Sequence, residues 1–507
     1  MSSASLPANR WLVLVAVMLA FLPVVLDMTI LHVAVPMLTQ SLNASGTEVL
    51  WIIDVYPLLT AGLLVPMGTL ADRVGNRKIL LVGLVAFAVA SAGAAFARSP
   101  AMLIAARVLL ALGGAMVMPS VLGLIRKTFE DEGERAMALG LWGMVGAAGA
   151  AVGPLVGGAL LEHFWWGSVF LINVPVMLVV APACHALLPR VEETTPGKWA
   201  IGQVLLLMAG MMSLVHGIKA GFGGKQPLPI TILVMSLGIA ALALFVRKQL
   251  RSSEPMLDLS LLSRPAIVTG LIMALVASGA LAGVELTLAQ ELQYVLGKTP
   301  LQAGIFMIPI MAAAAGGGPV AGHLSNRFGL RPVATLSLVI AAGALVFLAR
   351  SDFHDPGFRV PSALALLGLA LSIGLTASSI AIMGSVDASK GGAAGSLEAT
   401  GYELGTGLGI TLFGVFMSSA FSRAIELPAG LSRALAERAS RTIGDAYIVA
   451  GELPAEQGAA VIAAGKAAFS QTHAVLLTTA GAVIAALAVV VLFTLTGYGG
   501  LSRAHHR

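Results

Sequence analysis

The chain has 507 residues, of which 57% are hydrophobic and 11% are charged, and its formal net charge is +5. Soluble domains carry roughly 25% charged residues, and the basic residues here are spread along the chain rather than gathered in a patch. The composition therefore argues against a soluble enzyme and a nucleic-acid-binding protein, while a single cysteine, Cys184, leaves no intrachain disulfide and no cysteine-based metal site.

Apolar runs long enough to cross a membrane follow one another along the whole chain. A span takes roughly 20 helical residues, and fourteen such runs lie at 11–37, 49–71, 79–97, 101–125, 136–160, 166–188, 199–220, 229–246, 266–293, 301–324, 332–349, 360–384, 392–421 and 473–496. Lipid offers the backbone no hydrogen-bond partner, and none of the runs alternates like a barrel strand. We therefore predict an all-α polytopic membrane protein.

The distribution of lysine and arginine predicts that both termini are cytoplasmic. With that orientation, cytoplasmic loops hold 18 of the 30 basic residues, namely Arg10, Arg73, Arg77, Lys78, Arg126, Lys127, Arg135, Arg190, Lys198, Arg247, Lys248, Arg251, Arg264, Arg327, Arg331, Lys390, Arg503 and Arg507. The opposite short loops hold Arg98, Lys219, Lys225, Lys298, Arg350 and Arg359. Arg107 is the one basic residue that we place inside a span.

Two turns on the cytoplasmic side indicate an internal repeat. Residues 68–78 read GTLADRVGNRK between the second and third spans, and residues 322–331 read GHLSNRFGLR between the tenth and eleventh. A glycine, a leucine, an arginine, a glycine and an arginine recur at the same offsets. We therefore predict two six-helix bundles at 11–188 and 266–507, with a central helix pair and cytoplasmic linkers at 189–265. Such repeated halves are typical of secondary transporters.

One connection on the outer side is much longer than the others. Residues 422–472 are rich in alanine and charged residues, and they contain Pro428 and Pro454. Proline interrupts a helix. A pair of short helices over the outer mouth and a solvated loop fit this composition equally well.

Several motifs together resemble the major facilitator superfamily, and within it the fourteen-helix drug:proton antiporters. Residues 68–78 match the superfamily signature G-x-L-a-D-r-x-G-r-k, and residues 26–36, LDMTILHVAVP, resemble the first-helix motif of the fourteen-helix branch, with His32 where asparagine is usual. Residues 149–158, GAAVGPLVGG, match the antiporter motif G-x-x-x-G-P-x-x-G-G, and residues 170–175, FLINVP, match the motif that begins the sixth helix.

Two further regions refine this resemblance. Arg107 fits the arginine of motif B, although the usual Gln-Gly after it reads Leu110-Ala111. Around residues 285–293 the sequence looks most like exporters of methyl viologen and quaternary ammonium antiseptics. The resemblance implies two pseudo-symmetric six-helix bundles with two inserted helices, and export of drugs in exchange for protons.

Charged side chains inside a span cost about 2.5–3.5 kcal/mol each at its centre on insertion scales, so each one points to a function. The candidates for proton coupling are Asp27, Asp54, Arg107, Glu398 and Glu403. The candidates for substrate binding are Asp27, Asp54, Glu285, Glu398, Trp142 and Phe306, the two aromatic rings being able to hold a flat cation.

Each candidate also has a simpler interpretation. A hydroxyl such as that of Thr29 could satisfy Asp27, and Arg107 could be a structural partner of an acid or of backbone carbonyls. The two aromatic rings could be packing residues. Glu291, at the rim of the ninth span, is expected to be solvated.

Two sets of residues are candidates for a conformational gate. In the loop signature, Gly68 lets two helices meet closely, and the charges of Asp72, Arg73 and Arg77 could hold the cytoplasmic side shut. In the fifth span the candidates are Gly149, Gly153, Pro154 and Gly157. Small residues allow close helix packing, and the resemblance implies that this helix lines the boundary between the halves.

Motifs for other chemistries are missing from the sequence. Gly297-Lys298-Thr299 would end a phosphate-binding loop, but Leu292 stands where its first glycine must be. The nine histidines are dispersed, with no pair at helical spacing inside a span. We therefore expect no enzyme activity, no metal and no cofactor, with the proton gradient as the source of energy.

The predicted function is proton-coupled multidrug efflux of lipophilic organic cations, such as quaternary ammonium compounds, cationic dyes and biocides, by alternating access. The alternative is a proton-coupled exporter of a neutral or anionic metabolite on the same fold. The expected partners are these cations, protons and the lipid bilayer, without nucleic acid. We expect a monomer in the inner membrane of a bacterial cell.

Overall fold

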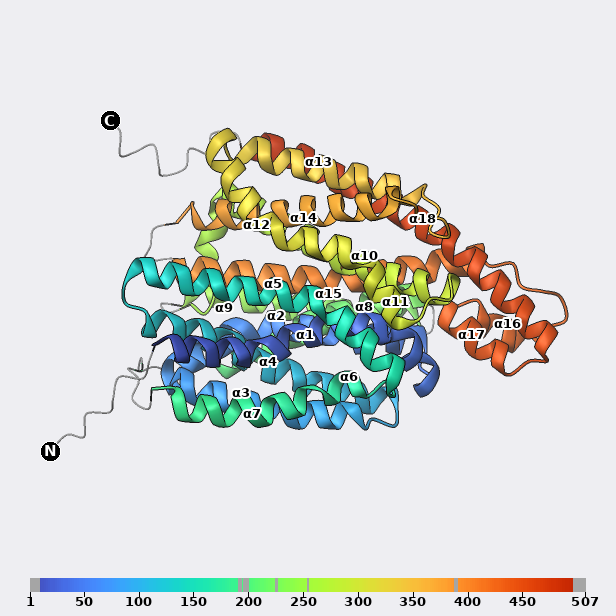
Figure 1. Cartoon of the computed structure of the whole chain (residues 1–507), viewed down its shortest axis with the longest axis horizontal. Coiled ribbons are helices and arrows are strands. Elements are labelled where there is room, and N and C mark those ends of the chain that lie inside the picture. Colours follow the sequence, from blue (N-terminus) through green and yellow to red (C-terminus); the bar gives the residue numbers. More distant parts are fainter. Residues whose placement is uncertain are drawn as a thin grey trace.

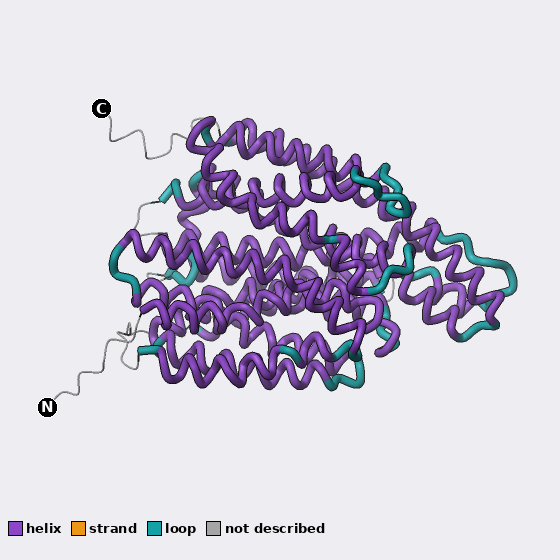
Figure 2. The backbone as a smooth tube through the Cα atoms, in the orientation of Figure 1, coloured by secondary structure: helices purple, strands orange, loops and turns teal. Residues whose placement is uncertain are grey.

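The computed structural model describes residues 10–189, 194, 200–223, 227–252, 255–386 and 391–495. In these ranges every regular element is a helix, and the long helices run side by side in one elongated bundle (Figures 1 and 2). The first helical set comprises α1 (Arg10–Leu42), α2 (Gly46–Val74), α3 (Asn76–Ala95), α4 (Pro100–Thr128), α5 (Glu132–His163), α6 (Ser168–Leu171) and α7 (Asn173–Leu187).

The remaining helices form an inserted pair and a second helical set. The inserted pair is α8 (Ile201–Gly223) and α9 (Leu228–Arg251), which the short 3-10 helix η1 (Leu259–Ser263) follows. The second set comprises α10 (Pro265–Gln290), the π-helical turn η2 (Glu291–Val295), α11 (Pro300–Phe306), α12 (Ile308–Phe328), α13 (Leu330–Ala349), α14 (Arg359–Met383), α15 (Gly391–Ala424), α16 (Arg433–Ala439), α17 (Ile443–Gly451) and α18 (Ala455–Thr494).

Thirteen spans of this structure are long and apolar enough to cross a membrane. The pair α11 and α12, bent by 41° at Met307, supplies a fourteenth when it is counted as one span. Because these helices follow the predicted runs from the first to the last, the predicted all-α polytopic fold is confirmed.

The internal repeat seen in the sequence is present in the backbone. Gly75 joins α2 to α3 with φ 109°, and Gly329 joins α12 to α13 with φ 87°. Only glycine adopts this conformation readily, because it has no Cβ. The two glycines that recur at the same offset therefore make the same kind of sharp turn in the two helical sets.

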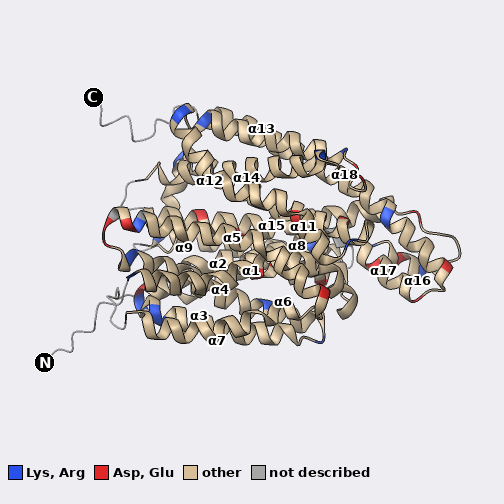
Figure 3. Ribbon diagram, in the orientation of Figure 1, with Lys and Arg blue, Asp and Glu red and all other residues tan. Residues whose placement is uncertain are grey.

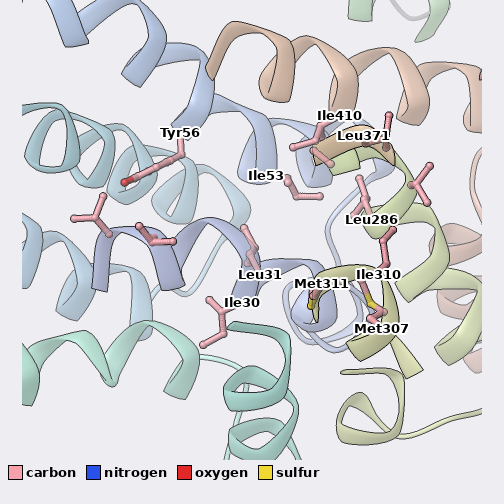
Figure 4. Packing of buried hydrophobic residues seen from close by; sticks show 14 of the residues in the cluster. Ile30, Leu31, Ile53, Tyr56, Leu286, Met307, Ile310, Met311, Leu371 and Ile410 are labelled. Atoms are coloured by element: carbon pink, nitrogen blue, oxygen red, sulfur yellow. The ribbon is translucent and has the colours of Figure 1, made fainter. Parts of the chain in front are cut away.

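The two helical sets meet along a boundary that we call the seam. It is formed by α1, α2 and α5 on one side and by α10, α11, α12 and α15 on the other. Figure 4 shows Ile30, Leu31 and Ile53 of the first set near Leu286 and Ile410 of the second, within one buried cluster. The inserted helices pack against each other, and α8 contacts both α2 and α15.

The two ends of the bundle differ. We call the end where α1 begins and α18 ends the terminal end, and the opposite end the cap end (Figure 1). The cap, residues 425–454, contains α16 and α17. At 1.5 Å per residue, the 40 residues of α18 measure about 60 Å, twice the hydrocarbon core. Its first part therefore extends beyond the core and packs on the cap through Val461 and Phe469.

Of the two forms expected for the segment 422–472, the structure has the pair of short helices. The segment contains the two short helices α16 and α17, and its last third belongs to α18. Phe421 of α15 lies in the same buried cluster as Ile443 and Val449 of α17, so the cap has a small apolar core of its own.

Charged residues gather at the two ends of the bundle, including many lysines and arginines at the terminal end (Figure 3). Several residues used in the orientation argument, Arg190, Lys198, Lys225, Lys390, Arg503 and Arg507, lie outside the described residues. The placement of Lys219 in a loop was wrong, because this residue lies in α8 and is 3% exposed. Arg107 is therefore not the one basic residue inside a span.

Candidate functional site

Asp27 and Arg107 form a buried ion pair within the first helical set. Asp27 lies near the middle of α1, and Arg107 Nη1 of α4 contacts its Oδ2. Arg107 Nε also donates to the carbonyl of Ile52 at 3.0 Å, and the guanidinium lies 4.7 Å from the centre of the Tyr56 ring. The pairing expected for Arg107 is therefore present, whereas the hydroxyl of Thr29 bonds to the backbone of its own helix.

Asp54 is the centre of a second buried cluster, which joins three parts of the molecule. Its Oδ1 accepts a hydrogen bond from Nζ of Lys219 on α8 at 2.7 Å. Its Oδ2 accepts one from Oγ1 of Thr411 on α15 at 2.5 Å. Asp54 itself lies on α2 and is 0% exposed, so this carboxylate is shared by the first set, the inserted pair and the second set.

A third pair of titratable groups meets across the seam. His32 Nδ1 of α1 lies 3.5 Å from Glu285 Oε2 of α10, and both side chains are buried. The carbonyl of Val33, the next residue of α1, accepts a hydrogen bond from Gln293 Nε2 of η2 at 3.1 Å. The seam is therefore bridged by polar contacts at the level of His32, beside the apolar packing described above.

Glu403 of α15 is the acid in the second set that is most deeply buried among the predicted candidates. It is 2% exposed, and its Oε2 has no hydrogen-bond partner in the part of the chain that the structure describes. Tyr56 lies within electrostatic range of Asp27, Arg107 and Glu403. Glu398, one and a half turns away on the same helix, is half-buried, as expected for two residues that face different directions.

The expectation that Glu291 is solvated was wrong. Its side chain is 3% exposed, because η2 turns it toward α18. Ser470 Oγ donates to its Oε1 at 2.5 Å, and His473 Nδ1 lies 3.5 Å from its Oε2. This group sits within the second set, beside the ring of Phe353.

The glycines of α5 make close contacts on two sides. A Cβ on Gly149 would lie 3.0 Å from Leu22 Cδ1 of α1, so α1 and α5 approach closely. A Cβ on Gly158 would lie 2.6 Å from Leu301 Cα of α11, and one on Gly304 would lie 2.6 Å from the carbonyl oxygen of Pro154. The prediction that this helix lines the boundary between the halves therefore agrees with the observed packing.

Two other candidates of α5 face α1 in the same way. A Cβ on Gly153 would meet the side chain of Thr29, and a Cβ on Gly157 would lie 2.6 Å from Ile30 Cγ1. Added side-chain volume at either position would push α1 and α5 apart.

The signature loop, residues 68–78, forms a hydrogen bond to another helix of the first set. Gly68 of α2 faces α4, but a Cβ there would lie 3.4 Å from Pro119 Cβ, which is an ordinary packing distance, so the expected close approach is not seen at this position. Arg77 Nη2 donates to the carbonyl of His185 on α7 at 2.7 Å. Asp72 is exposed and Arg73 is half-buried.

The two aromatic candidates pack against other rings. Trp142 of α5 lies 5.1 Å from Phe21 of α1, and Phe306 lies 6.4 Å from Phe353 at the cap end. These contacts fit the packing role that was their alternative interpretation.

Lys219 of the Asp54 cluster was not among the predicted site residues, although the sequence contained a signal for it. Lys219 falls inside the predicted span 199–220, and a lysine within a span needs a partner. The partnership of His32 with Glu285 had no such signal, because 253 residues separate them along the chain.

Comparisons with known proteins agree with this architecture. A family model described as Major Facilitator Superfamily matches residues 17–410. The methyl viologen resistance protein SmvA of Salmonella typhimurium is 45% identical over 487 residues, which cover 96% of this chain and 98% of the relative. The multidrug efflux pump LfrA of Mycolicibacterium smegmatis is 35% identical over 491 residues, which cover 97% of each chain.

A solved structure shows the same fold at low identity. A bacterial homologue of the human lysosomal transporter Spinster, in an inward-facing and unoccupied conformation, superposes with a TM-score of 0.68 at 19% identity, and the match covers 98% of each chain. Taken with the family model and the relatives, the helical sets and their seam identify a multi-pass membrane transporter of the drug-efflux type. The chain belongs to the major facilitator superfamily.

Proposed function

We propose that this transporter is a proton-coupled antiporter that exports lipophilic organic cations, such as quaternary ammonium compounds, cationic dyes and biocides, by alternating access. The observation that carries the proposal is the set of buried carboxylates, Asp27, Asp54, Glu285 and Glu403, on helices that form the seam. We further propose that it works as a monomer in a bacterial inner membrane, with both termini in the cytoplasm and the proton gradient in place of a cofactor.

The coupling follows from the chemistry of a carboxylate in a low-dielectric site. A buried carboxylate is costly unless a proton or a counter-cation neutralises it. Protons that arrive from the outside would neutralise the acids, and their release to the cytoplasm would leave ionised carboxylates that attract an organic cation. Because one carboxylate cannot stabilise a proton and a cation at once, the two would exchange rather than travel together.

The seam contacts support a state that is closed at the cap end. The contacts of His32 with Glu285, of Gly158 with Leu301 and of Thr39 with Gly444 of the cap all lie in the half of the bundle nearer the cap. With the termini in the cytoplasm, the cap end faces outward. Breaking these contacts would then open the path to the outside.

The names of the relatives support the substrate class. SmvA is a methyl viologen resistance protein and LfrA is a multidrug efflux pump, and methyl viologen is an aromatic dication. A cation of this kind fits a site that offers carboxylates and aromatic rings.

A pH-jump assay in proteoliposomes tests the proposal. Purified protein is reconstituted at an internal pH different from the external one, and the movement of methyl viologen, ethidium and tetraphenylphosphonium is followed together with the internal pH. We expect each cation to move against its gradient while protons move the opposite way. Transport that ignores the pH gradient, or the absence of transport for all three cations, would refute the proposal.

A second candidate is a proton-coupled exporter of a neutral or anionic metabolite. The observation that favours it is that Asp27 and Asp54 are each balanced by a buried cation, Arg107 and Lys219, so their sites are close to neutral overall. A relative named tetracenomycin C resistance and export protein, from Streptomyces glaucescens, is 32% identical over 503 residues, which cover 97% of this chain and 93% of the relative. Including uncharged and anionic compounds in the same assay separates the two candidates.

A further inference from the structure

Asp54 has an aromatic neighbour that completes a cation-binding arrangement. Trp51 precedes it by three residues on α2, so the two side chains share one helix face. Lys219 Nζ lies 2.7 Å from Asp54 Oδ1 and 3.5 Å from the centre of the Trp51 ring. The ring of His216, one turn before Lys219 on α8, stacks on Trp51 with a centroid distance of 6.2 Å. The ammonium is thus held by a carboxylate and an aromatic face together.

A carboxylate beside an indole face is also the arrangement that recognises organic ammonium ions. Trp is the aromatic side chain that attracts cations most strongly, and desolvation strengthens this attraction. The same two groups, Asp54 and Trp51, would therefore bind the charged end of a lipophilic cation. In this structure the chain's own ammonium fills that place.

The occupant of this site comes from outside the two helical sets. Lys219 lies on α8, one of the inserted helices, and reaches between α2 and α15 to the seam. Its ammonium is carried on a flexible four-carbon side chain that belongs to neither set. A buried ion pair is seldom the most stabilising choice for a packed core, since apolar side chains often do as well. The pair therefore calls for a role beyond packing.

Empty space adjoins the ammonium on the side of the cap. A cavity of about 90 Å³ is lined by Lys219, Thr39 of α1, Gln290 of α10, Ser418 of α15 and Gly444 of α17. It therefore extends from the Asp54 cluster to the underside of the cap. The cavity therefore lies on the side of the ammonium toward which a cation released at the cap end would move.

The position of Asp54 along the bundle places the site after Asp27 on an outward path. Asp54 is eight residues from Gly46, where α2 begins at the cap end, whereas Asp27 is fifteen residues from Leu42, where α1 ends there. At 1.5 Å per residue these distances are about 12 Å and 22 Å. Asp54 is therefore the nearer of the two carboxylates to the outer cavity.

We propose that Asp54 and Trp51 form a second binding subsite for organic cations, on the cap side of Asp27, and that Lys219 is an internal counter-cation that fills this subsite when no transported cation is present. The inference rests on the proposed function, because it requires a cationic substrate. Lys219 would displace the departing cation and keep Asp54 paired after its release. Release toward the cap would then be favoured over return.

Binding of tetraphenylphosphonium to the purified full-length protein tests this inference. Isothermal titration calorimetry at pH 8.5, where protons compete least for carboxylates, compares the wild type with Lys219→Met. If Lys219 occupies the subsite nine-tenths of the time, its removal should strengthen binding about tenfold. Efflux from proteoliposomes should slow at the same time, because nothing displaces the bound cation.

Three further variants locate the effect. Lys219→Met combined with Asp54→Asn should lose the gain in affinity, because the carboxylate is gone. Lys219→Met combined with Trp51→Leu should lose most of it, because the aromatic face is gone. Lys466→Met removes a partly exposed lysine from α18 and should leave affinity and efflux unchanged.

The outcomes separate this inference from the proposed function. Unchanged or weaker binding by a folded Lys219→Met protein, with wild-type binding and efflux intact, would show that Lys219 is structural and would overturn the inference alone. A wild-type protein that neither binds nor exports the cation would overturn both. If Lys219→Met fails to fold, Lys219→Gln, whose amide can still donate to Asp54, is expected to show the same gain and is judged by the same criterion.

Discussion

The two buried acid–base pairs, Asp27–Arg107 and Asp54–Lys219, have similar chemistry but different places in the architecture. Asp27 and Arg107 both belong to the first helical set, so a movement of the second set leaves them together. Asp54 shares hydrogen bonds with Lys219 of the inserted pair and Thr411 of the second set. A movement at the seam must therefore change the partners of Asp54. The contact between Asp27 and Arg107 can therefore persist through the cycle, whereas the contacts of Asp54 change with the movement.

We expect loss of the charge on Asp27 to have the largest effect. Asp27→Asn leaves Arg107 buried without its anionic partner, and breaking such a pair costs roughly 3–5 kcal/mol. Cation transport driven by a pH gradient in proteoliposomes should fall about a hundredfold or more. The purified variant should also melt at a lower temperature.

Asp352 supplies the control for this change. It lies in the exposed loop between α13 and α14, where a hydrogen bond from the backbone N–H of His354 lowers the pKa of its carboxyl. It is therefore ionised throughout the neutral range, and Asp352→Asn removes the same charge without opening a buried pair. Transport by the Asp352→Asn variant should equal that of the wild type. Normal coupled transport by Asp27→Asn would remove Asp27 from the mechanism.

Added volume where α5 meets α11 should have the next largest effect. Gly158→Val places a side chain against the backbone of Leu301, where even a Cβ would lie 2.6 Å from Cα. Overpacking of this kind typically costs 1–3 kcal/mol, and here it would hold the cap end apart. We expect transport to fall about tenfold. A pair of spin labels placed across the cap end should report a longer distance.

Gly140 provides a matched position on the same helix. A Cβ there would have nothing within 4 Å, so Gly140→Val adds the same volume without a clash. Its transport should stay close to that of the wild type. Equal losses in the two variants would mean that helix propensity, rather than packing at the seam, causes the defect.

The sequence predicts the fold of this protein much better than its site. Apolar runs and the repeated glycine turns at Gly75 and Gly329 are local signals, because length and backbone conformation are decided within a few residues. The pairing of Arg107 with Asp27 could be predicted because a charge inside a span needs a partner. Glu291 could not be placed, since only the packing of α18 against η2 shows that it is buried.

The Asp54 cluster shows why the rest of the site could not be predicted. Its three members come from α2, α8 and α15, and Thr411 is 357 residues away from Asp54 in the chain. A threonine in a span commonly bonds to its own backbone, as Thr411 also does with Gly407. No periodicity distinguishes a hydroxyl that bonds to its helix from one that also crosses the seam.

Removal of the seam-crossing hydrogen bond should give a moderate effect. Thr411→Val keeps the shape of the side chain and the Asp54–Lys219 pair, and it removes one hydrogen bond worth about 1 kcal/mol. The population open at the cap end should rise about fivefold. The measurement is the rate at which a membrane-impermeant maleimide labels Ser418→Cys, which lines the outer cavity, with Cys184 replaced by alanine.

Thr406→Val is the control for this measurement. Thr406 lies on the same helix, is half-buried, and donates to the carbonyl of Tyr402 within α15. Its loss removes an intrahelical bond but none across the seam, so the labelling rate should not change. If both variants raise labelling equally, the bond from Thr411 to Asp54 does not hold the seam.

The smallest effect is expected at the third contact, between His32 and Glu285. Their 3.5 Å separation exceeds the 2.7–2.9 Å of a charge-assisted hydrogen bond, so the contact contributes little to closing the seam. His32→Asn should change transport and Ser418→Cys labelling by less than about twofold. A change as large as that of Thr411→Val would show that position along the seam, rather than the strength of each contact, decides how the cap end opens. The Asp54 cluster would then be one of several contacts that close the seam to the same extent. The different places of the two buried pairs would not explain how the cap end opens.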